Sequence, residues 1–289
     1  MTTARGVAEA GERPFASVAV LGLGVMGGSL ARALSELPDR PRIAGWSPEG
    51  AEREAARTAG VVHDAPSSWQ EAVADAELVV LATPLRASCD LLEEIAGTVP
   101  VTATLSDVAS LKAPLLRMAV AAGVDSRWVG SHPMAGSEAS GFGASAASLY
   151  RGARVWTVAT AAARERVPRV HAFWRSIGAR PAEIDADEHD RMMSLASHLP
   201  QLTANALATV MMEAGLEPDQ LGPGGLDTTR LAASSAELWK DLLEHASPDL
   251  VGGLRALSAE AGRIADMLEA GDTEAVANTM RSTRAWRQP

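Results

Sequence analysis

Two patterns of apolar residues divide this chain. Up to about residue 184, short apolar or β-branched runs alternate with alanine-rich stretches of helical spacing. This alternation is typical of βαβ units, in which helices join parallel strands. Strands are expected at residues 17–21, 42–46, 78–82, 104–106, 128–130 and 155–160. We therefore predict an α/β domain over residues 15–184, built as a doubly wound, mostly parallel sheet.

Beyond residue 184 the β pattern ends. Helical apolar spacing covers residues 188–213, 228–246 and 248–270, with breaks at Gly215, at the turn 222–225 and at Pro248. We predict an all-helical domain over residues 185–289, and its apolar helices suit the interface of a homodimer. Residues 1–14 carry both charge signs and no apolar core, so they are expected to form a flexible tail and not a signal peptide.

Composition excludes several classes of protein. The 289 residues contain no run of about 18 uncharged apolar residues, so no membrane span is expected. The net charge of −10 argues against nucleic-acid binding. Cys89 is the only cysteine, which excludes an intrachain disulfide and a thiolate metal cluster, and the scattered histidines lack metal-ligand spacing. A cytoplasmic protein that acts on small molecules without a metal is favoured.

A glycine signature follows the first expected strand. Gly22, Gly24 and Gly27 form a G-x-G-x-x-G pattern that opens a helical run, the context of a Rossmann-type dinucleotide site. Gly22 permits the tight turn, Gly24 lets the backbone approach a pyrophosphate, and Gly27 lets the helix pack closely on the strand. The expected cofactor-binding set also contains Met26 within the signature, and Thr83 and Pro84 after the strand 78–82.

The end of the second strand bears on the choice of cofactor. Many dinucleotide sites carry an acid there, which binds the ribose and repels a 2′-phosphate. This chain has Ser47, which can donate to a phosphate, and Arg53 and Arg57 follow on the next helix. NADP is slightly favoured for this reason. Glu49 is an alternative acid, so NAD is also a candidate.

His132 is the candidate base. It lies between glycines and hydroxyl side chains in the segment 130–141, and imidazole accepts protons near neutral pH. A loop histidine satisfied by backbone groups is the alternative interpretation.

Several further motifs occur in a fixed order along residues 18–243. In this set the chain resembles the prephenate and arogenate dehydrogenases. The motifs, besides the glycine signature, are D-V-A-S-L-K (107–112), G-S-H-P-M-A-G-S-E (130–138), E-H-D (188–190), S-H-L-P-Q (197–201), D-T-T-R-L-A (227–232) and E-L-W-K-D (237–241).

The resemblance implies an oxidative decarboxylation of a cyclohexadiene that carries a hydroxyl at C4 and a carboxylate at C1. Hydride leaves C4 for a nicotinamide, the hydroxyl loses its proton, and carbon dioxide leaves C1. His132 would be the base, and Ser110 would orient it and bind the substrate hydroxyl, or cap the helix from Leu111, or both. Arg230 would hold a substrate carboxylate, with an ion pair to Asp227 as the alternative.

The rest of the substrate set is also implied by the resemblance. It consists of Ser131, His198 and Gln201. Gln201 stands where relatives that use prephenate often have histidine, and its amide could accept from the ammonium group of arogenate. Lys112 has a lesser claim on a carboxylate and is otherwise expected to face solvent. His189 and Asp190 are interpreted as a structural pair at a helix start.

Other functions stay open from sequence. The substrate is expected to be arogenate, with prephenate or an amino-substituted prephenate of natural-product synthesis as alternatives. Gly225 and Leu226 depart from the family pattern beside the expected carboxylate pocket. A β-hydroxyacid dehydrogenase would need a lysine in the second domain, where Lys240 is the only one. A nonenzymatic nucleotide-binding module would need none of His132, Ser110 and Arg230.

Overall fold

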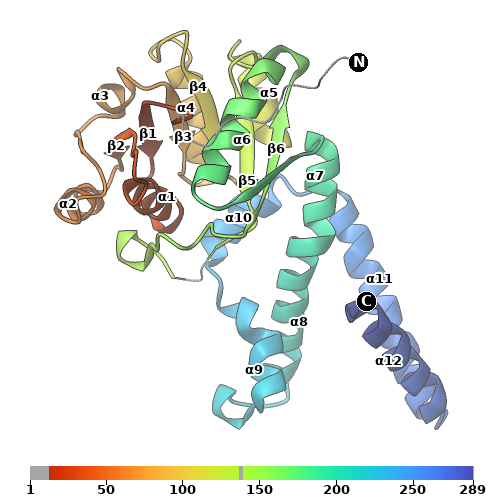
Figure 1. Cartoon of the computed structure of the whole chain (residues 1–289). Coiled ribbons are helices and arrows are strands. Elements are labelled where there is room, and N and C mark those ends of the chain that lie inside the picture. The colour runs from red at the N-terminus through yellow and green to blue at the C-terminus, as the bar shows by residue number, and fades with distance from the viewer. Residues whose placement is uncertain (1–12, 137–138, 289) are drawn as a thin grey trace, which may run out of the picture. The chain divides into compact units, whose positions relative to one another are not determined.

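The computed structural model describes residues 13–136 and 139–288, which form two compact units (Figure 1). The first unit comprises Met1–Asp190 with Ser234–His245, and the second comprises Arg191–Ala233 with Ala246–Pro289. Most of the expected flexible tail, residues 1–12, lies outside the described residues. Within the described part of the chain, no helix is long and apolar enough to cross a membrane.

A four-stranded parallel sheet forms the centre of the first unit. Its strands, in the order β2-β1-β3-β4, are β2 (Arg42–Trp46), β1 (Ser17–Leu21), β3 (Leu78–Leu81) and β4 (Thr104–Asp107). Successive side chains of a strand point to opposite faces. In β1, Val18 and Val20 join one buried cluster while Ala19 and Leu21 join another. Both faces of the sheet are therefore buried.

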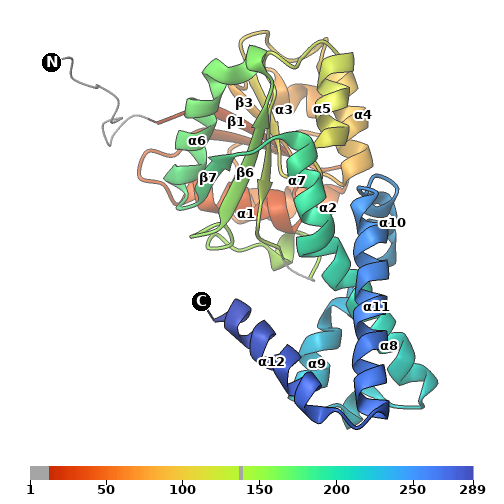
Figure 2. The same cartoon turned by 90° about the vertical axis from the view of Figure 1, so that its right-hand side faces the viewer.

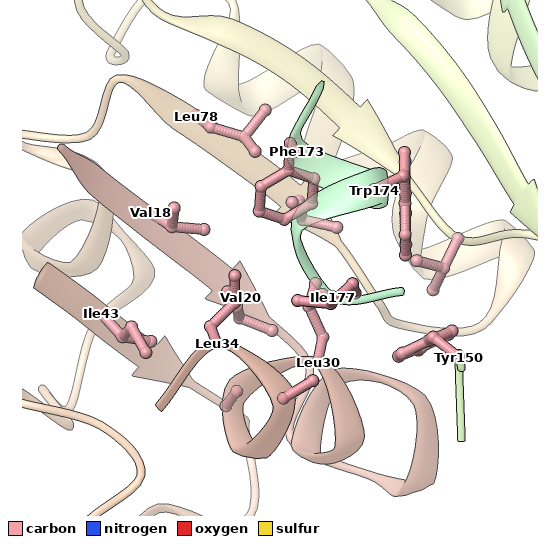
Figure 3. Close-up of a cluster of buried hydrophobic side chains, with 14 of the residues drawn as sticks. Val18, Val20, Leu30, Leu34, Ile43, Leu78, Tyr150, Phe173, Trp174 and Ile177 are labelled. Carbon is pink, nitrogen blue, oxygen red and sulfur yellow. The ribbon is translucent and has the colours of Figure 1, made fainter. Parts of the chain in front are cut away.

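Helices cover both faces. The first cluster contains side chains of α1 (Val25–Ser35) and α6 (Val167–Ser176), and the second contains those of α3 (Trp69–Val73), α4 (Leu85–Ile95) and α5 (Ala113–Ala121). Figure 3 shows Val18 and Val20 in one cluster with Leu34 of α1 and Phe173 of α6. Figure 2 shows α1 and α6 on one side of the sheet and α4 and α5 on the other. The predicted doubly wound arrangement is confirmed.

A second sheet extends the first unit. Its strands are β5 (Val129–Pro133), β6 (Arg154–Ala159) and β7 (Arg180–Glu183), and β6 pairs antiparallel with β5 and parallel with β7. A single bridge between Leu105 and Trp128 links β4 to the segment before β5. β7 was not expected, because this edge strand has the sequence Arg-Pro-Ala-Glu and no β-branched or aromatic residue.

The remaining helices follow in chain order. They are α2 (Gly50–Thr58), α7 (Ala186–Met193), α8 (Leu199–Glu213), α9 (Pro223–Thr229), α10 (Ala236–Leu243), α11 (Asp249–Glu269) and α12 (Thr273–Arg287). The expected single helix over 188–213 is interrupted by a π turn, Ser194–His198, just before Pro200, whose missing N–H and bulky ring favour a distorted turn. The expected helix over 228–246 is broken where Ser235 caps α10. α12 was not expected, and the all-helical character of the second unit is confirmed.

Candidate active site

The glycine signature forms a tight turn between β1 and α1. Gly22 has a φ of 103°, and a Cβ there would lie 2.5 Å from the carbonyl oxygen of Ala82. A Cβ on Gly27 would lie 1.8 Å from the carbonyl oxygen of Gly22. Packing therefore requires both glycines. At Gly24, by contrast, a Cβ would have no described atom within 4 Å, so protein packing gives no reason for glycine there.

The space beside Gly24 suits an anionic group. Gly24 is the N-cap of α1, and its own side chain is absent, so the N–H groups of the first helical turn have no side-chain acceptor from the cap. A helix start of this kind stabilises phosphate. The turn thus fits the pyrophosphate of a dinucleotide, as the sequence predicts.

A cavity of about 420 Å³ adjoins this turn. Its walls come from the carboxyl ends of β1, β3 and β4, where ligands of open α/β sheets bind. Expected cofactor residues and expected catalytic residues line the same space: Gly24, Met26, Thr83, Pro84, Ser110 and His132. Asp241 and two leucines of α10 also line it. The structure therefore brings the two predicted groups together.

His132 ends a buried chain of side chains. Its Nδ1 lies 2.8 Å from Nε2 of His189, and Nδ1 of His189 lies 2.7 Å from Oδ1 of Asp190. His189 is fully buried and Asp190 almost so. The two residues, interpreted from sequence as a pair at a helix start, do lie in α7, and they also contact the candidate base. Sequence spacing gave no sign of that contact.

Asp190 is itself held by the start of α5. Its Oδ1 accepts from the backbone N–H of Lys112 at 2.8 Å, and its Oδ2 accepts from that of Ala113 at 2.9 Å. Burial alone would raise the pKa of Asp190, but the hydrogen bonds from His189 and from these two N–H groups lower it below the ordinary value. Asp190 is therefore ionised at neutral pH. It also takes the capping role at this helix start that had been one interpretation of Ser110.

Lys112 does not face solvent, and that expectation is wrong. Its side chain is fully buried, forms an ion pair with Asp107 and donates to the carbonyl oxygen of Ser131 at 2.7 Å. Burial lowers the pKa of Lys112 and raises that of Asp107, and the opposite charge of each partner counteracts this. Oδ2 of Asp107 has no hydrogen-bond partner among the described residues. The pair holds the strand residue that precedes His132.

Ser131 is displaced from its predicted role. Its hydroxyl lies in the protein interior, 3.0 Å from Oγ of Ser106, and accepts from Nε1 of Trp174 at 3.0 Å. It does not line the cavity. Because side chains alternate along β5, His132 faces the cavity while Ser131 faces away from it. Ser131 is thus a packing residue of the interior.

The hydroxyl of Ser47 faces two carboxylates. Its Oγ lies 2.8 Å from Oε2 of Glu49 and 2.6 Å from Oε2 of Glu52. Arg53 donates to the backbone carbonyl groups of Ser47 and Pro48. Arg57 pairs with a different glutamate, Glu54, on the helix surface. The Ser47 hydroxyl thus faces two carboxylates, while the guanidinium of Arg53 contacts the backbone of the same residue.

The other substrate candidates belong to the second unit. His198 is buried at the end of the π turn. Nε2 of Gln201 donates to Oδ1 of Asn205 at 2.9 Å and to the carbonyl oxygen of Leu231 at 2.6 Å. Gln201 thereby ties α8 to the turn that carries Arg230. Arg230 is exposed and forms no ion pair with Asp227 or with any other residue that the structure describes.

Lys240 does not line the large cavity. It lines an adjoining hollow of about 370 Å³ with Arg86, Asp90 and the glutamates of α10 and its end, and this hollow shares Pro84 and Asp241 with the large cavity. A lysine acid or base of the β-hydroxyacid dehydrogenase kind is thus not found in the candidate site. Among the described residues, no group of three or more His, Cys, Asp or Glu side chains is arranged to hold a metal ion.

Comparison with known proteins gives a consistent family. The family model of the prephenate dehydrogenase nucleotide-binding domain matches residues 30–183, and that of the prephenate dehydrogenase dimerization domain matches residues 185–282. The prephenate dehydrogenase of Bacillus subtilis is 29% identical over 279 residues, which cover 94% of this chain and 75% of that protein. A cyclohexadienyl dehydrogenase of Zymomonas mobilis is 29% identical over 245 residues, covering 82% of this chain and 83% of that protein.

A solved structure shares the fold. The prephenate dehydrogenase of Aquifex aeolicus, in complex with hydroxyphenyl propionate and NAD+, superposes with a TM-score of 0.86 at 23% identity. The match covers 94% of this chain and 96% of that one.

Proposed function

Because the chain belongs to the prephenate dehydrogenase family, we propose that it catalyses the NAD-dependent oxidative decarboxylation of a cyclohexadienyl substrate. The observation that carries the proposal is the single cavity lined by both the glycine turn and His132. A sheet edge that binds a dinucleotide needs the turn but has no need of a histidine, whereas a dehydrogenase needs both. The nucleotide-binding alternative without catalysis leaves the placement of His132 and Ser110 unexplained.

Several residues that line the cavity have proposed roles in this reaction. The N–H groups at the start of α1 bind the pyrophosphate, and Met26, Thr83 and Pro84 form the wall beside the nicotinamide and its ribose. A bound nicotinamide dinucleotide supplies the hydride acceptor. His132 takes the proton of the C4 hydroxyl, and Ser110 binds the same hydroxyl and helps to orient His132. Arg230 belongs to the second unit, and the family resemblance supports a role for its guanidinium in pairing with a substrate carboxylate.

The proposed cofactor is NAD rather than NADP. Glu49 and Glu52 place two carboxylates around Ser47, at the position where a 2′-phosphate would have to lie. Two like charges near a phosphate oppose binding, whereas ribose hydroxyl groups can donate to the same carboxylates. The turnover assay described below compares NAD+ with NADP+ and so tests this choice.

The proposed substrate is arogenate. The family resemblance supports this choice, because Gln201 stands where relatives that use prephenate often have histidine, and an amide oxygen can accept from an ammonium group. An acceptor suits arogenate, which carries an α-ammonium group where prephenate carries a keto group. Prephenate is the second candidate, and it is supported by the relatives named above.

A homodimer through the helical unit is the proposed assembly. α8, α11 and α12 expose large apolar side chains, among them Met212, Met280 and Trp286, which is 80% exposed. Apolar surface of this extent marks an interface. Light scattering should give a mass of twice 30.1 kDa, and substitution of Met280 by Glu should shift it toward the mass of one chain.

The deciding experiment is a turnover assay. Reduction of the cofactor is followed by absorbance with arogenate, prephenate and the amino-substituted prephenate, each with NAD+ and with NADP+. The expected result is turnover with NAD+ and arogenate, and the matched control is His132→Asn, in which turnover falls by about 100-fold or more. Turnover of none of the three by the native protein would reject the proposed function.

A further inference from the structure

We propose that His189 is a positioning residue that sets the tautomer of His132, so that Nε2 of His132 is the proton acceptor. The proposal rests on the proposed function, because it explains how the proposed base, His132, is positioned. It starts from the buried series Asp190, His189 and His132, in which two hydrogen bonds of 2.7 and 2.8 Å join three side chains.

The direction of the first bond follows from Asp190. Its carboxylate accepts from two backbone N–H groups at the start of α5, and these bonds keep its pKa low, so it is an acceptor only. Nδ1 of His189 must therefore carry a hydrogen. In a neutral imidazole the other nitrogen is then an acceptor, so Nε2 of His189 cannot donate.

The direction of the second bond follows from the first. Since Nε2 of His189 accepts, Nδ1 of His132 must donate to it. With both rings neutral, this is the only arrangement of hydrogens that satisfies both bonds. Nε2 of His132 then carries no hydrogen and has the lone pair that a general base needs.

The same series stabilises the product of the proton transfer. Once His132 has become an imidazolium, its Nδ1–H still donates to His189, and His189 still donates to the anionic Asp190. The negative charge of Asp190 thus acts on His132 through one intervening ring, as the carboxylate of a catalytic triad acts directly on its histidine. Two other described charged groups lie near His132. Lys112 contacts the carbonyl of Ser131, and Asp241 lines the cavity.

The series of Asp190, His189 and His132 is rigid because each side chain is held in place by its neighbours. His189 is fully buried, and its ring packs edge-on against that of His132 with 5.0 Å between centroids. His132 lies on β5, where the buried pair of Lys112 and Asp107 fixes the preceding carbonyl. The imidazole therefore has one defined orientation toward the cavity.

The first test reads the tautomer directly and needs no substrate. A long-range ¹H–¹⁵N correlation spectrum of the native protein resolves which ring nitrogen of each of the six histidines carries hydrogen. His132→Asn and His189→Leu assign the two signals by their loss. The expected pattern has hydrogen on Nδ1 of both rings. Hydrogen on Nε2 of His132 would overturn the proposal, whatever the enzyme does in solution.

The second test compares two variants of His189. Glutamine offers both an amide N–H for Asp190 and a carbonyl for His132, whereas leucine offers neither. We expect His189→Leu to lower kcat by about 10- to 100-fold with little change in KM, and to move the acidic limb of the kcat profile to lower pH, because the imidazolium loses its support. His189→Gln should restore most of kcat and the position of that limb.

Further controls distinguish this proposal from a packing role for His189 and from failure of the proposed function. In a His132→Asn background, His189→Leu should cause no further loss, because the residues act as a unit. Equal loss of kcat in the glutamine and leucine variants, with an unmoved pH profile, would reduce His189 to a packing residue. If the native protein turns over no cyclohexadiene, the proposed function fails, while the tautomer pattern can still be read.

Discussion

Removal of the buried ammonium group of Lys112 should destabilise this protein more than an ordinary substitution does. In Lys112→Met the carboxylate of Asp107 stays fully buried and loses its cationic partner, while the N–H of Ala109, at 2.9 Å, still donates to it. Breaking a buried ion pair from one side costs about 3–5 kcal/mol. A further part comes from the carbonyl of Ser131, which loses its donor.

The double variant distinguishes the pair from simple packing. In Asp107→Asn with Lys112→Met no charge remains, and the asparagine oxygen can still accept from Ala109. We expect a loss of at most about 2 kcal/mol, because replacing both members of a buried ion pair is often close to neutral. The two substitutions should thus be strongly non-additive, with a coupling of about 2 kcal/mol or more.

Urea unfolding followed by tryptophan fluorescence measures these changes. Six of the seven tryptophans, including the buried Trp128 and Trp174, lie in the first unit, so the signal reports on the sheet around the pair. With a slope of about 2–3 kcal/mol per M, the midpoint of Lys112→Met should fall by about 1–2 M. A shift below about 0.3 M, or additive single variants, would refute the reasoning.

The pH dependence of the variant has a defined sign. Burial already holds the folded-state pKa of Asp107 above its unfolded value, and loss of the ammonium group raises it further. A carboxyl group whose folded pKa is raised contributes its stability below the unfolded pKa and loses it as pH rises through the folded pKa. The deficit of Lys112→Met should therefore be smaller at about pH 5 than at about pH 8. An equal deficit at both values would mean that Asp107 does not titrate in this range.

Three further predictions concern single sites. His132→Asn should lower turnover by about 100-fold or more while the cofactor dissociation constant, measured by calorimetry, stays unchanged; unchanged turnover would reject its role as base. Joint replacement of Glu49 and Glu52 by glutamine should raise kcat/KM for NADP+ by about 30-fold, because each carboxylate contributes roughly 1 kcal/mol of repulsion, whereas Glu54→Gln, on the outer helix surface, should leave the preference unchanged. Burial raises the pKa of the Cys89 thiol to about 11, so its alkylation by iodoacetamide should still accelerate about tenfold per pH unit between about pH 8 and 10, where a free thiol levels off.

The features that sequence predicted well are local ones. The buried strands β1 and β3 are continuous apolar runs, and this pattern is typical of parallel strands covered on both faces. The glycine turn also depends on residues close in sequence: Gly27 packs on Gly22, five positions earlier. Interactions between residues so close in sequence depend on one short segment. They could therefore be predicted without a structure.

The features that sequence missed depend on distant residues. Nδ1 of His132 meets a ring 57 positions away, and the backbone of Lys112 meets a carboxylate 78 positions away. A lysine after a strand is exposed in most proteins, since burial of an unpaired charge is costly. The ion pair with Asp107 on β4 makes the burial of Lys112 possible. Likewise, the two carboxylates beside the Ser47 hydroxyl depend on side-chain rotamers of Glu49 and Glu52, which no motif specifies.

The start of α5 links the stability of the first unit to the position of His132, the proposed base. One short segment places a buried ammonium group under β5 and, through its backbone N–H groups, fixes the carboxylate of Asp190. The first connection reaches the carbonyl of Ser131, which precedes His132, and the second reaches the His132 ring through His189. A substitution at Lys112 therefore acts on the base in two ways, by lowering the folded fraction and by moving the imidazole within the folded state. Because a displacement of about 1 Å can cost 100-fold in rate, the specific activity of folded Lys112→Met should fall further than its loss of stability alone accounts for.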